Sequence, residues 1–205
     1  MSGLLALEDG SVFYGESVGA DGLAAGEAVF TTGMSGYQEA VTDPSFAEQI
    51  VCFTAPMVGN YGVAEGRNES DRIHAKAVLM REARGPEWTG WLRERGIVAL
   101  TGIDTRSLVL QLRERGAMRA VAVAGDVSAD EAVAAARAQT PMTGRALARE
   151  VSTQEMRFLG EEGRARIAVV DYGVKNSVLR RLAAAGAVAM TIAGGAVVHA
   201  HEGGA

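Results

Sequence analysis

Side chains that commonly act as nucleophiles or metal ligands are sparse in this chain, which has 1 cysteine and 3 histidines. Cys52 lies in the run Gln-Ile-Val-Cys-Phe-Thr, which reads as a strand and lacks the flanking glycines of a sharp nucleophile turn. We interpret Cys52 as a buried small apolar residue. His74 falls in a predicted strand over residues 73–80 and is interpreted as structural. The sequence therefore predicts no catalytic residue.

The other two histidines, His199 and His201, precede Glu202 in a tail rich in glycine and alanine. Two histidines this close could form an accidental metal pair. Zinc sites use three or four protein ligands, and no third ligand is evident here. We predict no metal site and no cofactor in this chain.

Residues 29–62 hold the densest collection of turn residues and polar groups. Two strand-like runs, residues 28–32 and 49–54, flank an irregular segment that contains Ser45. Loops fixed at both ends by strands often carry binding residues, and a serine hydroxyl can both donate and accept hydrogen bonds. The alternative is a pair of surface turns, in which Asp43 forms an Asx turn and Ser45 is an ordinary turn residue.

The first part of the chain mixes strands and helices without strict alternation. Asp9-Gly10 between two apolar runs predicts a hairpin of residues 4–7 and 11–14. We interpret residues 19–26 as a turn-rich link. Further strands and capped helices are predicted from apolar spacing and terminal Ser, Asp and Gly residues: strands at 97–101 and 117–124, and helices at 86–95, 104–115 and 128–138.

The later part of the chain reads as the opening of a parallel α/β domain. Polar residues 153–166 are interpreted as a linker, and an apolar strand follows over residues 167–170. The turn Asp171-Tyr172-Gly173 leads into a helix over residues 176–185 and a strand over 188–192. The predicted fold class is α/β, with a mixed β/α domain over 1–152, the linker, and a short α/β segment over 167–205.

Composition narrows the possible partners and location. The formal net charge of −5 disfavours nucleic acid as the main partner. We find no signal peptide and no apolar run of about 18 residues, so we predict no membrane association. A single cysteine cannot form an intrachain disulfide, which favours a reducing cytoplasm.

Several short motifs in the first 151 residues carry a family resemblance. They are Gly36-Tyr37-Gln38-Glu39, Thr42-Asp43-Pro44-Ser45, Gly59-Asn60-Tyr61-Gly62, Ile103-Asp104-Thr105-Arg106 and Leu112-Arg113-Glu114-Arg115-Gly116. In this order they resemble the N-terminal domain of the small subunit of glutamine-hydrolysing carbamoyl-phosphate synthase. The resemblance runs from about residue 5 to residue 151.

The resemblance implies a role in making carbamoyl phosphate for arginine and pyrimidine synthesis. In that family the small subunit releases ammonia from glutamine, and a large subunit uses it with ATP and bicarbonate. ATP and Mg are therefore expected on the large subunit, and no Gly-x-x-x-x-Gly-Lys phosphate loop occurs here. The first domain is expected to contact the large subunit, and Ser45 is expected to help bind glutamine.

Residues 167–187 resemble the first strand and helix of a class I glutamine amidotransferase domain. Such domains place a nucleophile in Gly-x-Cys-x-Gly, followed later by a histidine and a glutamate, and neither pattern occurs here. The resemblance ends at about Met190; a frameshift, a premature stop or an incomplete gene model would each account for this. We therefore expect a truncated domain, no glutaminase activity from this chain alone, and poor order over residues 167–205 in a monomer.

Two other functions are compatible with the residues. The first is a non-catalytic module that docks on the large subunit without delivering ammonia. The second is an unrelated nucleotide-binding α/β protein, which would need a glycine-rich turn after Val170.

Overall fold

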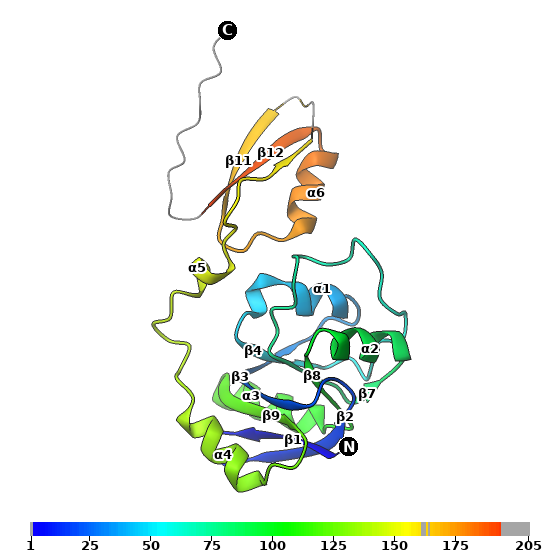
Figure 1. The fold of residues 1–205 in the computed structure, drawn as a ribbon, viewed down its shortest axis with the longest axis vertical. Helices are drawn as coiled ribbons and strands as arrows, with labels where there is room; N and C mark the ends of the chain where they lie inside the picture. Colours follow the sequence, from blue (N-terminus) through cyan, green and yellow to red (C-terminus); the bar gives the residue numbers. More distant parts are fainter. Residues whose placement is uncertain (1, 161–162, 164, 194–205) are drawn as a thin grey trace. The chain divides into compact units, whose positions relative to one another are not determined.

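The computed structural model describes residues 2–160, 163 and 165–193. These fall into two compact units, Met1–Gly144 and Arg145–Ala205. Each is described by itself below, and Figure 1 gives the order of the elements along the chain. Within the described ranges, no helix is long and apolar enough to cross a membrane.

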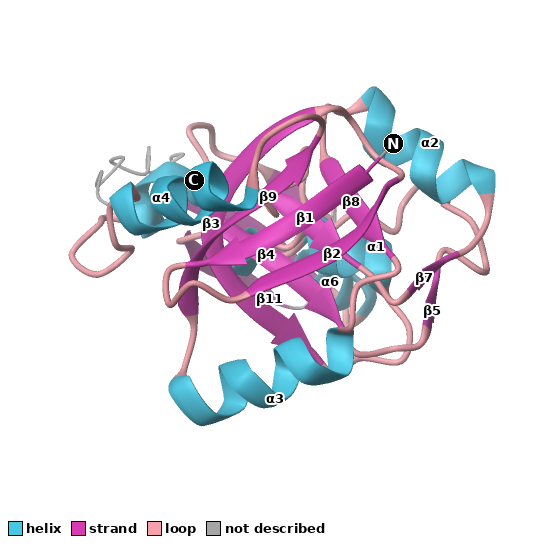
Figure 2. Ribbon diagram, turned by 90° about the horizontal axis from the view of Figure 1, so that it is seen from below, coloured by secondary structure: helices cyan, strands magenta, loops and turns pink. Residues whose placement is uncertain are grey.

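The first unit is built on a closed seven-stranded barrel, in the order β1-β2-β8-β6-β4-β3-β9 (Figure 2). A separate two-stranded parallel sheet joins β5 (Met57–Val58) to β7 (Glu82–Ala83). The barrel strands are β1 (Ser2–Leu7), β2 (Val12–Ser17), β3 (Gly22–Thr31), β4 (Gln49–Phe53), β6 (Ala77–Leu79), β8 (Val98–Thr101) and β9 (Met118–Ala124).

Pairing around the barrel is mixed. β3, β4, β6 and β8 run parallel to one another, while β1 and β9 pair antiparallel with their neighbours. β9 lies between β1 and β3, with Leu5 opposite Ala122 and Ala24 also opposite Ala122 on the other side. Closure removes exposed sheet edges, which are otherwise prone to pair with other chains.

Four α-helices and one 3-10 helix accompany the barrel. Alternate residues of a strand face opposite sides of the sheet, and in β1 the residues on both sides are buried. Leu5 and Leu7 join the interior cluster with Leu108 of α3, whereas Leu4 and Ala6 lie in a second cluster beneath α4. The helices are α1 (Tyr37–Thr42), η1 (Pro44–Phe46), α2 (Pro86–Glu94), α3 (Thr105–Arg115) and α4 (Ala129–Ala138).

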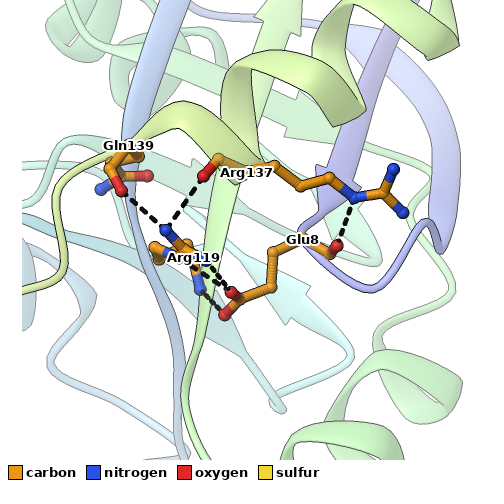
Figure 3. Close-up of polar contacts among 4 residues, drawn as sticks. All are labelled: Glu8, Arg119, Arg137 and Gln139. Atoms are coloured by element: carbon orange, nitrogen blue, oxygen red, sulfur yellow. Dashed lines mark hydrogen bonds and ion pairs between the residues drawn. The ribbon is translucent and has the colours of Figure 1, made fainter.

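An arginine network attaches the end of α4 to the barrel (Figure 3). The Arg119 guanidinium donates to the Glu8 carboxylate through Nε at 2.8 Å and Nη2 at 2.6 Å. Its Nη1 donates to the backbone oxygens of Arg137 and Gln139, and Arg137 Nε donates to the Glu8 backbone oxygen. These hydrogen bonds lower the pKa of Glu8, so the network is a structural ion pair.

The second unit contains a three-stranded sheet in the order β10-β12-β11. Its elements are α5 (Leu147–Val151), β10 (Phe158–Leu159), β11 (Ala165–Asp171), α6 (Asn176–Ala184) and β12 (Ala187–Ala193). β11 and β12 are parallel and are connected by α6, whose Leu179 is buried. The predicted strand-helix-strand opening of a parallel α/β segment is confirmed, as is the α/β fold class of the chain.

The division of the chain differs from the predicted boundaries. Compactness separates the units after Gly144, eight residues before the end of the predicted first domain at 152. The predicted linker, 153–166, contains β10, because Arg157 and Thr191 exchange hydrogen bonds and bring this segment alongside β12. His199, His201 and Glu202 lie outside the described residues.

Three local predictions in the first unit are wrong. Residues 19–26 were expected to form only a link, but β3 begins at Gly22 and pairs with β9. The strand expected over 73–80 is confined to Ala77–Leu79, since the amides of His74 and Ala75 donate instead to the Val41 oxygen. The segment expected to be irregular between β3 and β4 contains α1.

Candidate functional site around Ser45

The helix that precedes Ser45 is short, and side-chain contacts to a distant loop hold it in place. Its Thr42 hydroxyl accepts from the Glu69 amide at 2.9 Å and donates to the Gln38 oxygen. Gln38 is 2% exposed; it donates to the Ala64 oxygen and accepts from the Ala64 amide, both at 2.9 Å. The loop after β5 therefore supplies partners that six helical residues could not supply themselves.

Aromatic contacts attach the same loop to α1 and α2. The rings of Tyr37 and Tyr61 stack with centroids 4.2 Å apart, and Trp88 lies 4.7 Å from Tyr37. The Tyr37 hydroxyl donates to the Gly62 oxygen at 2.6 Å. Burial raises the pKa of Tyr37, so its phenol stays protonated and remains a donor. Gly59, with φ 97°, makes the turn in a conformation that favours glycine.

Ser45 lies in the 3-10 turn that follows this anchored helix. The buried Asp43 carboxylate accepts from the Ser45 amide at 2.9 Å, which is the Asx turn of the alternative interpretation. The Ser45 side chain is exposed, and its hydroxyl makes no hydrogen bond to the described part of the chain. The backbone of Ser45 thus has a structural role while its hydroxyl is available to a ligand. The glutamine-binding role of Ser45 stays a prediction.

Cys52 and His74 lie near this region of sequence, but their surroundings favour structural roles. Cys52 is 0% exposed in the barrel interior, and burial raises the pKa of its thiol to about 12. A protonated, inaccessible thiol cannot act as a nucleophile at neutral pH. Burial also lowers the pKa of His74, with a smaller contribution from Arg72. Among the described residues no metal-binding cluster occurs.

The turn after β11 is occupied by its own side chain. Asp171 is buried, and its Oδ1 accepts from the amides of Gly173 and Val174 at 2.8 and 2.9 Å. A bound phosphate would need such amides free to donate. The turn therefore closes the strand-helix connection and argues against the nucleotide-binding alternative.

The structure places the recognised motifs within one unit, and a family profile matches the same region. The sequence profile of the family described as "Carbamoyl-phosphate synthase small chain, CPSase domain" matches residues 5–122, from β1 to β9. This chain belongs to the carbamoyl-phosphate synthase small chain family. The resemblance predicted from the motifs is thereby confirmed, and the matched residues include at least part of every barrel strand.

Individual small chains agree with the profile. The chain is 41% identical to the carbamoyl phosphate synthase small chain of Xanthomonas campestris pv. campestris, over 89% of this chain and 54% of that protein. It is 43% identical to the Chlorobaculum tepidum small chain, over 89% of this chain and 52% of that protein. It is 40% identical to the Methanosarcina acetivorans small chain, over 89% of this chain and 54% of that protein. The chain spans about half the length of these curated small chains.

The residues that position Ser45 were not predicted from the sequence. Tyr37 and Gln38 were recognised as parts of a family motif but received no role. Their function is to bind the loop of residues 59–73, which follows α1 by more than fifteen residues. No local pattern in the sequence reveals such a pairing. The one available hint is a Gln beside a Tyr in a turn-rich segment, because such a polar side chain needs hydrogen-bond partners if it is buried.

Proposed function

We propose that this chain is the barrel-containing part of a small subunit of carbamoyl-phosphate synthase and that it docks on the large subunit in the cytoplasm. In the whole synthase the small subunit would supply ammonia from glutamine for carbamoyl phosphate, and hence for arginine and pyrimidine synthesis. ATP and Mg would be bound by the large subunit. The observation that carries the proposal is the profile match over residues 5–122, which includes at least part of every barrel strand.

The direct test is complex formation with a carbamoyl-phosphate synthase large subunit. Purified chain and large subunit should co-elute as a complex in size-exclusion chromatography with light scattering. The complex should also retain carbamoyl phosphate synthesis from free ammonia, bicarbonate and ATP. Failure to co-elute at micromolar concentrations of both proteins would contradict the proposal.

A second candidate function for the chain as it stands is that of a docking module without glutaminase activity. Cys52 favours it, because the one thiol in the sequence is 0% exposed and has a pKa of about 12. We expect no release of ammonia from glutamine by residues 1–205, either alone or in the complex. Glutaminase activity that survives Cys52→Ala would require a nucleophile other than a thiol and would overturn this expectation.

Ser45 supplies a sharper test of the glutamine site. In a small chain of full family length, assembled with the large subunit, Ser45→Ala should lower glutamine-dependent kcat/KM by about tenfold, as expected for loss of a hydrogen bond to a charged substrate group. Ammonia-dependent activity should be unchanged. Ser35→Ala removes an exposed hydroxyl from the loop before α1 and is the matched control. Equal effects on glutamine and ammonia would contradict the assigned role.

A further inference from the structure

A cleft with several basic side chains lies at one end of the barrel, and Ser45 is not among its lining residues. It has a volume of about 410 Å³ and is lined by residues that follow β4 and β6 together with one side of α3. β4, β6 and β8 are parallel, so their carboxyl ends share one edge of the sheet. Thr54 and Arg81 follow the first two strands, and α3 follows the third; the topology therefore brings them together.

One side of α3 forms the opposite wall. Leu108 and Leu112 point into the barrel interior and fix the rotation of the helix. Arg106 and Arg113 are seven residues apart, which places both on one helical face two turns apart. Leu110 lies between them and is 46% exposed. The wall therefore presents two guanidinium groups on either side of an apolar contact.

The arginines of this cleft differ from the others in the first unit. Arg84, Arg115 and Arg119 form ion pairs with Glu82, Asp9 and Glu8. Elsewhere in the unit, arginine side chains contact backbone oxygens or aromatic rings.

Within residues 2–144 as described, the guanidinium groups of Arg81, Arg106 and Arg113 have no hydrogen bond, ion pair or aromatic contact. No carboxylate lines the cleft. These three guanidinium groups therefore converge without a hydrogen bond or ion pair to a carboxylate among those described residues, in a chain whose formal net charge is −5.

Two further residues bear on the electrostatics. Thr105 is 4% exposed and lines the cleft, and its hydroxyl makes no hydrogen bond in the described chain. Asp104, next to it, is the nearby carboxylate, and it caps α3: Ser107 donates to it through its hydroxyl at 2.7 Å and its amide at 3.1 Å. These hydrogen bonds, and to a smaller extent Arg81, lower the pKa of Asp104. The ionised Asp104 carboxylate therefore offsets part of the Arg81 charge, whereas Arg106 and Arg113 make no ion pair within the described residues of this unit.

We propose that this cleft binds a small organic or inorganic oxyanion, with Arg81, Arg106 and Arg113 as its charge partners and Thr54 and Thr105 as hydroxyl donors. Guanidinium groups match carboxylate and phosphate oxygens in paired hydrogen bonds. The volume is in the range of small-molecule sites, and Val109 and Leu110 would contact the carbon skeleton of an organic ligand. The site goes beyond the proposed subunit role and does not depend on it.

Calorimetric titration of the 205-residue chain with inorganic phosphate, pyrophosphate and citrate, at constant ionic strength of about 0.15 M, tests the site. We expect at least one of these anions to bind with a Kd below about 1 mM, and the three to rank by how well they fill the cleft. The double variant Arg106→Gln/Arg113→Gln should bind at least about tenfold more weakly. Backbone amide shifts should be confined to residues near 54, 81 and 105–113.

The control variant is Arg180→Gln, which removes one exposed charge from α6 in the second unit. Arg180→Gln should leave anion binding unchanged. The single variant Arg113→Gln should weaken anion binding. It is included so that a fold defect of the double variant does not decide the outcome. Equal weakening in Arg180→Gln and Arg113→Gln would show a net-charge effect and overturn the proposal. So would the absence of binding by all three anions at 10 mM. If small anions fail while Arg106→Gln/Arg113→Gln abolishes the complex with the large subunit, the cleft is a protein contact and the proposal is wrong.

Discussion

The two units of this molecule differ in how completely they bury their sheets. In Met1–Gly144 the sheet closes on itself, and its residues form three apolar clusters, inside the barrel and against helices outside it. In Arg145–Ala205 a three-stranded sheet has α6 packed against its strands, and Val170 of β11 is 55% exposed. A parallel strand with an apolar run normally has both faces covered.

The difference leads to an expectation about which unit is the more stable. The profile match lies within the first unit, where buried side chains come from every strand of the barrel except β2. Among the described residues of the second unit, the buried apolar ones are Leu179, Ala187 and Ala189. Since stabilisation grows with the apolar area removed from water, we expect the free energy of unfolding of the first unit to exceed that of the second.

The largest expected effect comes from Trp88, which is 0% exposed and packs between Tyr37 and Trp91. Trp88→Ala should reduce the free energy of unfolding of the first unit by about 3–5 kcal/mol, because it leaves a large cavity between α1 and α2. Urea titration followed by far-UV circular dichroism measures this. A change below about 1 kcal/mol would show that the helices outside the barrel add little stability.

A smaller and local effect is expected from Leu179→Ala, which removes the main apolar contact of α6. It should cost about 2 kcal/mol in the second unit and leave amide exchange in the barrel strands unchanged. In the unaltered chain, amides of β11 and β12 should already exchange at least about tenfold faster than those of β4. Equal protection in both units would contradict the contrast between them, as well as the poor order expected from sequence over residues 167–205.

Local signals in the sequence predicted those elements whose stability is local. The Asp9-Gly10 hairpin and the capped helices expected over 104–115 and 128–138 appear in the structure, with Asp104 and Ser128 as the capping residues. Each depends on contacts within a few residues, so their residue types are informative. In the second unit the strand, turn and helix were predicted for the same reason.

Elements that depend on distant partners were not predicted. The helix α1 begins after Gly36, is six residues long, and is held by Ala64 and Glu69. Closure of the barrel requires β9 to pair with both β1 and β3, which no local pattern encodes. For the site, the Asx turn of Asp43 was predictable, but the convergence of Arg81 with Arg106 follows from parallel strand order.

The Glu8–Arg119 pair provides a pH-dependent test of the barrel. The pKa of Glu8 is lowered from 4.5, chiefly by hydrogen bonds from Arg119, so its stabilisation is complete above pH 4.5 and is lost as the pH falls through the lower folded-state value. Glu8→Gln should reduce the free energy of unfolding by about 1–2 kcal/mol at pH 7, and by progressively less as the pH falls below 4.5. A difference that does not change with pH would exclude ionisation of Glu8 as the cause.

The smallest expected effects compare two serines in turns. The Ser128 hydroxyl accepts from the Glu131 amide and Glu131 accepts from the Ser128 amide, so Ser128→Ala should cost about 1 kcal/mol. The structural hydrogen bond of Ser45 is donated by its backbone amide to Asp43, and alanine retains that amide. Ser45→Ala should therefore change the free energy of unfolding by less than about 0.5 kcal/mol. Thermal unfolding of both variants measures this. A cost for Ser45→Ala as large as for Ser128→Ala would mean that its hydroxyl stabilises the fold, and an effect of Ser45→Ala on glutamine use could then arise from structure rather than from binding.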